Sequence, residues 1–165
     1  MQTGTLIRPA TISDESAVAE LAVGNDMFTA EEVGELTASF RDTVAGGPGG
    51  HRWWIATTAS GDVAGAAYVA PEPFADRVWN VYFLAVSPTL HGGGTGTQLM
   101  EHVEHELGRA GQDLARVLLV ETSNSEQYAG ARGFYRARGF DEEALIREFY
   151  GPGDDKVVFW KRVTS

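Results

Sequence analysis

The stretch "HGGGTGTQLM", residues 91–100, has four glycines within its first six positions and then continues into a helical apolar pattern. Glycine loses more conformational freedom on folding than any other residue, so a loop that only connects two elements has no need of four. The glycines therefore predict that something approaches this backbone closely. A glycine-rich segment between a strand and a helix is typical of an anion site, because free backbone N–H groups and the helix dipole favour a phosphate there.

Length and composition predict a single globular domain spanning residues 1–165, in which 43% of the residues are apolar and 22% are charged. The absence of cysteine excludes disulfides, thiolate catalysis and cysteine-based metal sites. The chain has no run of about eighteen apolar residues and no basic-then-apolar leader. We therefore expect no membrane span, no secretory signal and a cytoplasmic location.

The charge balance bears on the class of partner. Thirteen basic side chains stand against twenty-three acidic ones, which gives a net charge of −10 at pH 7. Such a charge argues against nucleic acid and anionic lipid as partners. It modestly favours a cationic partner such as an amine.

Apolar periodicity and turn residues predict the order β-α-α-β-β-β-α-β-α-β-β, a mixed α/β layer fold. The segments "AGGPGG" at 45–50 and "PEPFAD" at 71–76 are predicted as a loop and a turn. Thr29 and Glu32 have the spacing of a capping box for the second helix. The predicted strands are 5–11, 52–58, 63–70, 78–86, 116–122, 143–150 and 156–163, and the predicted helices are 13–24, 28–47, 95–111 and 126–139.

Two familiar phosphate-binding designs fit the glycine loop poorly. A P-loop needs a lysine and a hydroxyl residue after its glycines, whereas Thr97 and Gln98 follow Gly96. A dinucleotide fingerprint has partial support from Gly94 and Gly96, with Glu121 where a ribose-binding acid belongs. Against it, Leu99 stands in place of the third glycine.

A third design fits better. His91-x-x-Gly94-x-Gly96 resembles the Arg/Gln-x-x-Gly-x-Gly/Ala signature of the GNAT superfamily of acyl-CoA N-acyltransferases. The preceding "LAVSP" at 84–88 and the later "ARGFYRARGF" at 131–140 resemble further motifs of that superfamily, in the same order. The chain departs from the pattern where His91 replaces Arg or Gln, and where Tyr128 stands at a position that often holds asparagine.

The resemblance implies an α/β (α+β) GNAT fold over the whole chain. We expect one mixed, mostly antiparallel sheet of about seven strands with a parallel, splayed central pair, flanked by about four helices. It also implies that acetyl-CoA binds as the cosubstrate, with its pyrophosphate on the loop amides and its pantetheine arm along the strand before the loop. The implied cofactor-binding residues are Leu84, Ala85, Val86, His91, Gly92, Gly93, Gly94, Thr95, Gly96 and Thr97.

The same resemblance implies the chemistry of N-acetyl transfer by direct attack of an amine on the thioester. Tyr135 matches the general-acid tyrosine of the family and would protonate the departing thiolate. Glu121, at the end of the second central strand, would act as the base through a water that Asn80 and Tyr82 orient. Glu72 and Asp76, in the proline-containing turn, stay open as alternatives to Glu121.

The acceptor is expected to be a primary amine on a small molecule or a peptide, and a homodimer is expected from the habits of the superfamily. His102 and His105, three apart on one helix, are interpreted as a solvated face, so we expect no metal. Arg132 and Arg136 are interpreted as surface charge. The alternative function is an acyl-CoA sensor without turnover.

Overall fold

A computed structural model of the chain describes residues 4–45, 50–109 and 114–163. The predicted loop at 45–50 and the end of the predicted helix 95–111 lie partly outside the described residues. The order of elements agrees with the sequence pattern throughout. The strands are β1 Leu6–Pro9, β2 Arg52–Thr57, β3 Val63–Pro71, β4 Val78–Val86, β5 Val117–Ser123, β6 Asp141–Gly151 and β7 Asp154–Arg162. The α-helices are α1 Glu15–Gly24, α2 Val33–Thr43, α3 Thr95–Glu104 and α4 Ala129–Ala137.

Seven strands form one sheet in the order β1-β2-β3-β4-β5-β7-β6. The β4–β5 pair is parallel, and the pairs β1–β2, β2–β3, β5–β7 and β6–β7 are antiparallel. The expected sheet of about seven strands with a parallel central pair is therefore confirmed. Contacts divide the chain into two compact units, one of residues 1–70 and 83–105 and the other of residues 71–82 and 106–165.

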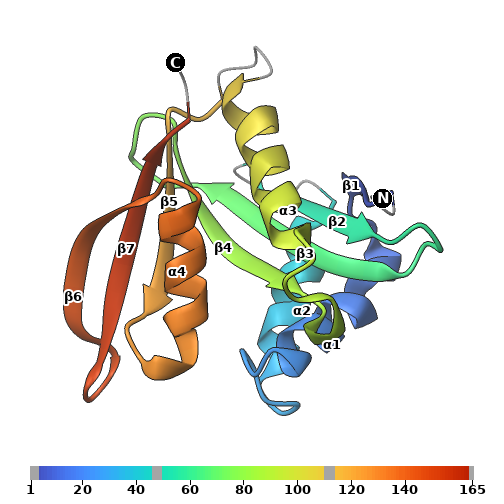
Figure 1. The fold of residues 1–165 in the computed structure, drawn as a ribbon, viewed down its shortest axis with the longest axis horizontal. Helices are drawn as coiled ribbons and strands as arrows, with labels where there is room; N and C mark the ends of the chain where they lie inside the picture. Colours follow the sequence, from blue (N-terminus) through green and yellow to red (C-terminus); the bar gives the residue numbers. More distant parts are fainter. Residues whose placement is uncertain (1–3, 46–49, 110–113, 164–165) are drawn as a thin grey trace. The chain divides into compact units, whose positions relative to one another are not determined.

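The first unit has helices on both faces of its strands. Side chains of α1 and α2, including Val18 and Phe40, pack with Trp53 and Tyr68 in one buried cluster. The ring of Trp53 stacks on Tyr68 with the ring centroids 4.4 Å apart. On the other face Leu99 of α3 is fully buried. The helices α1, α2 and α3 thus fix the strand from which the glycine loop leaves (Figure 1).

The second unit contains the parallel pair and the β6–β7 hairpin. Phe159 of β7 is fully buried and packs against Tyr135 of α4, with the ring centroids 5.5 Å apart. Beyond α3 the chain forms a π-helical turn, His105–Arg109. At Gly108 an added Cβ would stand 2.6 Å from the Val163 carbonyl oxygen, so this close approach requires glycine.

Two predicted helices begin later than the pattern suggested. Thr29 and Glu32 form the predicted reciprocal capping box, with bonds of 3.0 and 3.1 Å, yet the regular helix α2 begins only at Val33. The capping box thus closes the turn of residues 29–32, and α2 begins directly after this turn. Similarly, the segment predicted as helical from residue 126 opens with a 3-10 turn, Glu126–Tyr128, before α4 begins.

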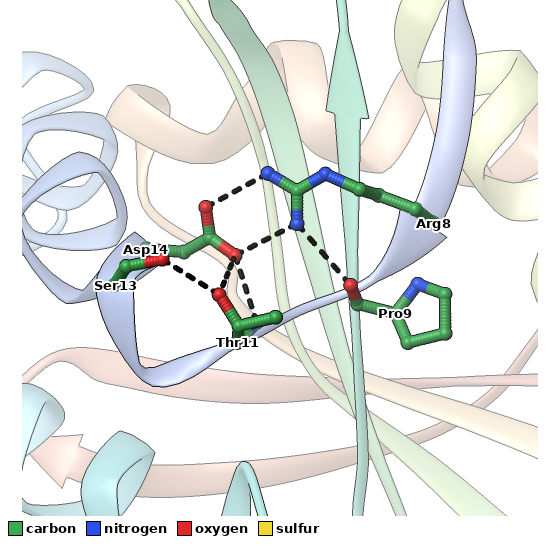
Figure 2. A network of polar contacts seen from close by, with 5 residues as sticks. All are labelled: Arg8, Pro9, Thr11, Ser13 and Asp14. Carbon is green, nitrogen blue, oxygen red and sulfur yellow. Dashed lines mark hydrogen bonds and ion pairs between the residues drawn. The ribbon is translucent and has the colours of Figure 1, made fainter.

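A polar network joins the first strand to the turn before α1 (Figure 2). The Arg8 guanidinium donates two hydrogen bonds to the Asp14 carboxylate, at 2.8 and 2.9 Å. The backbone N–H of Thr11 donates a third to the same carboxylate, at 2.8 Å. The Arg8 hydrogen bonds, with the Thr11 bond, hold the pKa of the buried Asp14 carboxyl below its ordinary value against the opposing effect of burial.

Within the described residues, no helix is at once long enough and apolar enough to cross a membrane.

Replacing Asp14 by asparagine is expected to lower the free energy of unfolding at pH 7 by about 1–2 kcal/mol, because charge-assisted bonds to a half-exposed Arg8 are lost. Since the folded-state pKa of Asp14 lies below its unfolded value, the stabilisation is present above the unfolded pKa. It is lost as the pH falls through the folded pKa. Urea unfolding at pH 7 and near pH 3 measures this. A difference in the free energy of unfolding between wild type and Asp14→Asn that is as large near pH 3 as at pH 7 would contradict the prediction. The control is Asp42→Asn, at an exposed carboxyl.

Candidate active site

The glycine loop leaves β4 through a 3-10 turn, Pro88–Leu90, and enters α3 at Thr95. Gly92 and Gly94 both have left-handed backbone angles, with φ of +83° and +89°. Residues with a Cβ rarely adopt this conformation, because the Cβ crowds the following carbonyl. The glycines at these two positions are therefore required by the path of the backbone.

The start of α3 presents backbone donors that the described residues do not use. Gly94 is the N-cap, and no side chain caps this end of the helix. The N–H of Gln98 donates to the Gly94 carbonyl, at 3.0 Å, as the first bond of the helix. Among the described residues, no backbone acceptor outside the helix is bonded to the N–H groups of Thr95, Gly96 or Thr97. Such groups, together with the helix dipole, form a ready anion site.

His91 does not point its ring nitrogen at the loop amides. Its Nε2 bonds to the carbonyl oxygen of Val86, at 2.9 Å, across the turn. The same oxygen accepts a bond of 3.0 Å from the side-chain amide of Asn25. His91 therefore stabilises the turn after β4. The histidine that replaces the usual Arg or Gln thus has a structural role in the loop.

Backbone groups at the end of β4 differ in what they can still bind. The Ala85 carbonyl oxygen points toward β3, where a Cβ on Gly65 would stand only 2.8 Å from it. The Val86 oxygen is occupied by Asn25 and His91. Because backbone groups alternate in direction along a strand, Leu84 directs its N–H and C=O away from β3. Leu84 is thus the residue of this segment whose two backbone groups are best placed to pair with an extended ligand.

Four polar side chains meet in the second unit. Asn80 of β4, with a side chain 1% exposed, donates from Nδ2 to Glu72 Oε1 at 2.8 Å and to Glu121 Oε2 at 2.6 Å. The hydroxyl of Tyr82 adds a longer bond to Glu72 Oε1, at 3.3 Å. One amide nitrogen therefore holds two carboxylates, one from the end of β3 and one from β5.

Glu121 is also paired with a cation. Its Oε1 forms an ion pair with the ammonium of Lys156 on β7, which is itself buried. The Lys156 ammonium lies over the ring of Phe149, 3.6 Å from its centroid. Each oxygen of the Glu121 carboxylate therefore has a fixed donor, and the carboxylate has one orientation.

Tyr150 lies at the edge of this polar group. Burial, followed by the negative charges of Glu121 and Asp154, raises the pKa of Tyr150 to about 12. The phenol is therefore protonated and neutral throughout the physiological pH range.

Tyr135 lies in the aromatic core of the second unit, with a side chain 7% exposed. Its ring packs edge-on against Phe140, with centroids 5.8 Å apart. Burial raises the pKa of Tyr135 well above its ordinary value, so the phenol keeps its proton. Arg138 Nε is the one buried side-chain polar atom of the described residues that lacks a hydrogen-bond partner.

Comparisons with known proteins agree with this geometry. A family model for the acetyltransferase (GNAT) domain matches residues 49–142. A solved GNAT-family protein from Desulfovibrio desulfuricans is 30% identical, covers 97% of this chain and 99% of its own, and superposes with a TM-score of 0.84. This chain belongs to the GNAT acetyltransferase family.

Two other solved structures share the fold at lower identity. The ribosomal-protein-S18-alanine N-acetyltransferase of Escherichia coli is 20% identical, with a TM-score of 0.75 over 98% of this chain and 96% of that one. A Salmonella typhimurium protein solved with acetyl-CoA is 17% identical, with a TM-score of 0.72 over 96% and 94%. No curated protein matches the chain.

The structure brings together some of the predicted site residues of this GNAT member. Asn80 and Tyr82, the alternate residues of β4, both bond to Glu72, and Asn80 also bonds to Glu121. Asp76 does not join them, because its carboxylate pairs with Arg116 and Arg77. The sequence analysis missed Lys156. The β5–β7 register places it opposite Ser123, two residues along β5 from Glu121, and the spacing of Lys156 and Glu121 in the sequence gives no sign of this.

The interpretation of Arg132 as surface charge is wrong. Its side chain is buried, and Nη1 donates to the carbonyl oxygens of Ser123 and Ser125 at 2.8 and 2.7 Å. Arg132 thus ties α4 to the end of β5. Arg136, one turn later, is exposed and pairs with Glu142, as expected for a surface residue.

His102, near the end of α3, and His105, at the start of the π-helical turn that follows, differ in their surroundings. His105 is exposed, while His102 packs edge-on against Trp54 with the ring centroids 5.4 Å apart. The described residues contain no group of three or more His, Asp or Glu side chains arranged to hold a metal ion.

Replacing Arg132 by methionine is expected to lower the free energy of unfolding by about 2–3 kcal/mol, because two carbonyl oxygens lose a charged donor. Arg136→Met is the matched control on the same helix, where loss of an exposed ion pair changes stability by less than about 1 kcal/mol. Urea unfolding of both variants measures the difference. Equal effects would show that the Arg132 bonds contribute little.

Proposed function

We propose that this GNAT member is an N-acetyltransferase that moves the acetyl group of acetyl-CoA to a primary amine by direct attack on the thioester. The observation that carries the proposal is the left-handed glycine loop at the start of α3, with its unused N–H groups, in a chain of this family. The Salmonella structure solved with acetyl-CoA supports the choice of cosubstrate.

The loop would bind the pyrophosphate through backbone donors. Gly92 and Gly94 let the chain turn around an anion without side chains in the way, and the first turn of α3 supplies the positive end of a dipole. Leu84 would pair with the pantetheine arm. The fit rests on backbone groups, so the loss of the usual Arg or Gln at His91 is compatible with binding.

In the proposed reaction one side chain accepts a proton and another donates one. The amine nitrogen attacks the carbonyl carbon, a carbon–nitrogen bond forms, and the carbon–sulfur bond then breaks. Glu121 would take the proton that the nitrogen loses, directly or through a water. Tyr135, whose buried phenol keeps its proton, would give that proton to the departing thiolate.

The acceptor would be an amine on a peptide or a small molecule. The Escherichia coli relative is named for a protein alanine as its substrate, and a net charge of −10 suits a cationic acceptor. The rival function is an acyl-CoA sensor without turnover, and no contact among the described residues favours it. The two differ in whether acetylated amine accumulates.

Acetyl-CoA in large excess is expected to raise the melting temperature of the wild-type protein by several degrees, whereas NAD leaves it unchanged. Gly94→Ala should reduce the shift by forcing a Cβ into a left-handed conformation. The matched control is Gly34→Ala on α2, where a Cβ meets nothing within 4 Å, and its shift should equal that of wild type. A rise in melting temperature with NAD but not with acetyl-CoA would overturn the proposed cosubstrate. Steady-state assays with a panel of amines distinguish an enzyme from a sensor.

Tyr135→Phe is expected to lower kcat by about 10²–10⁴-fold with little change in KM, because the thiolate loses its proton donor. The loss should shrink when acetyl-CoA is replaced by a thioester of a more acidic thiol, which leaves without protonation. Tyr68→Phe, at another buried tyrosine, is the control for packing. A loss that is the same for both thioesters would contradict the acid role.

A further inference from the structure

Asn80 uses its amide nitrogen in an uncommon way. Nδ2 has two hydrogens, and each is directed to a different carboxylate, Glu72 and Glu121. Because both oxygens bond to the same nitrogen, they cannot lie farther apart than the two bond lengths together. The side chain is almost fully buried, so a competing water does not replace either bond easily.

The two carboxylates are held differently. Glu121 has Asn80 on one oxygen and Lys156 on the other, so it can neither rotate nor shift without breaking a charged contact. Glu72 receives both of its side-chain bonds on Oε1, from Asn80 and Tyr82. Among the described residues, Glu72 is paired with no cation.

A carboxylate held in this way still accepts a proton. Each carboxylate oxygen has two lone-pair directions, and one donor on each leaves the others open. A general base works only when the open lone pair faces the proton that it removes, within ordinary hydrogen-bond reach. The orientation of Glu121 therefore matters as much as its presence.

We propose that Asn80 is a positioning residue of the acetyl transfer, which fixes the Glu121 carboxylate in its working orientation and couples it to Glu72 through one shared nitrogen. This inference rests on the proposed function, since it takes Glu121 as the base. Asn80 itself touches neither the acetyl group nor the amine. Its effect passes through the carboxylate, and Glu72 keeps the amide turned so that both of its hydrogens are used.

The chemistry of the acceptor separates this role from plain packing. A primary alkylamine is an ammonium ion at neutral pH and loses two protons on the way to the amide, one before attack and one after the carbon–nitrogen bond has formed. An amine with a pKa below the assay pH arrives neutral and loses only the second proton, from a nitrogen that bond formation has made strongly acidic. A residue that positions the base therefore matters much more for the first amine than for the second. A residue that only packs affects both alike.

The test compares kcat/KM for two such amines in wild type, Asn80→Leu, Glu121→Gln and the double variant. Asn80→Leu keeps the volume and removes both donors. We expect a loss of about 10²-fold or more with the alkylamine and less than about threefold with the weakly basic amine. The double variant should lose no more than Glu121→Gln alone, because both changes remove one function.

The control is Val81→Ala, at a buried neighbour on β4 whose side chain points to the opposite face of the sheet from Asn80. It should lower activity equally, and slightly, with both amines. If Asn80→Leu fails to fold by circular dichroism, Asn80→Ser, which is smaller and cannot reach both carboxylates, takes its place. If the Asn80 variants lower kcat/KM by the same factor with both amines, as Val81→Ala is expected to do, the positioning role is overturned while the proposed function stands. A wild type that acetylates no amine would overturn the proposed function and this role with it.

Discussion

Four backbone pairs, from Val78–Val117 to Val81–Val120, join the parallel strands β4 and β5. Beyond them each strand continues with other partners, so the backbone groups at the end of β4 must be satisfied by something else. Asn25 and His91 satisfy the Val86 oxygen, and the Ala85 oxygen lies close to Gly65 of β3. By the alternation along the strand, Leu84 directs its backbone groups away from β3. The short β4–β5 ladder thus determines which backbone groups at the end of β4 need other partners.

Side chains near that ladder follow the same logic. Asn80 and Glu121 lie on adjacent strands, with Asn80 one step before the last pair and Glu121 one step after it. Two carboxylates and one ammonium then share a confined space in the second unit, and a neutral amide links the two negative groups. Burying charged groups costs desolvation free energy unless each forms hydrogen bonds or ion pairs, and each of these groups does.

Much of this could be predicted from the sequence, because local patterns carry it. The β-branched and aromatic run at 78–86 predicted β4 with its bounds, and Thr29 and Glu32 predicted a capping box that forms. The family was indicated by the resemblance of two motifs, His91-x-x-Gly94-x-Gly96 and residues 131–140, which occur in the order found in the GNAT superfamily. Long-range contacts were not predictable in this way. Arg132 looked like any surface arginine, because nothing near it in sequence shows that Ser123 and Ser125 need a donor, and Lys156 meets Glu121 only through strand register.

The buried Arg132 has a consequence for motion. It donates to the carbonyl oxygen of Ser123, the last residue of β5, and to that of Ser125 just beyond, and it lies one helical turn before Tyr135 on α4. The strand end that bears the proposed base and the helix that bears the proposed acid are therefore clamped by a single guanidinium. The two Arg132 bonds therefore resist a change in the distance between the proposed proton acceptor and the proposed proton donor.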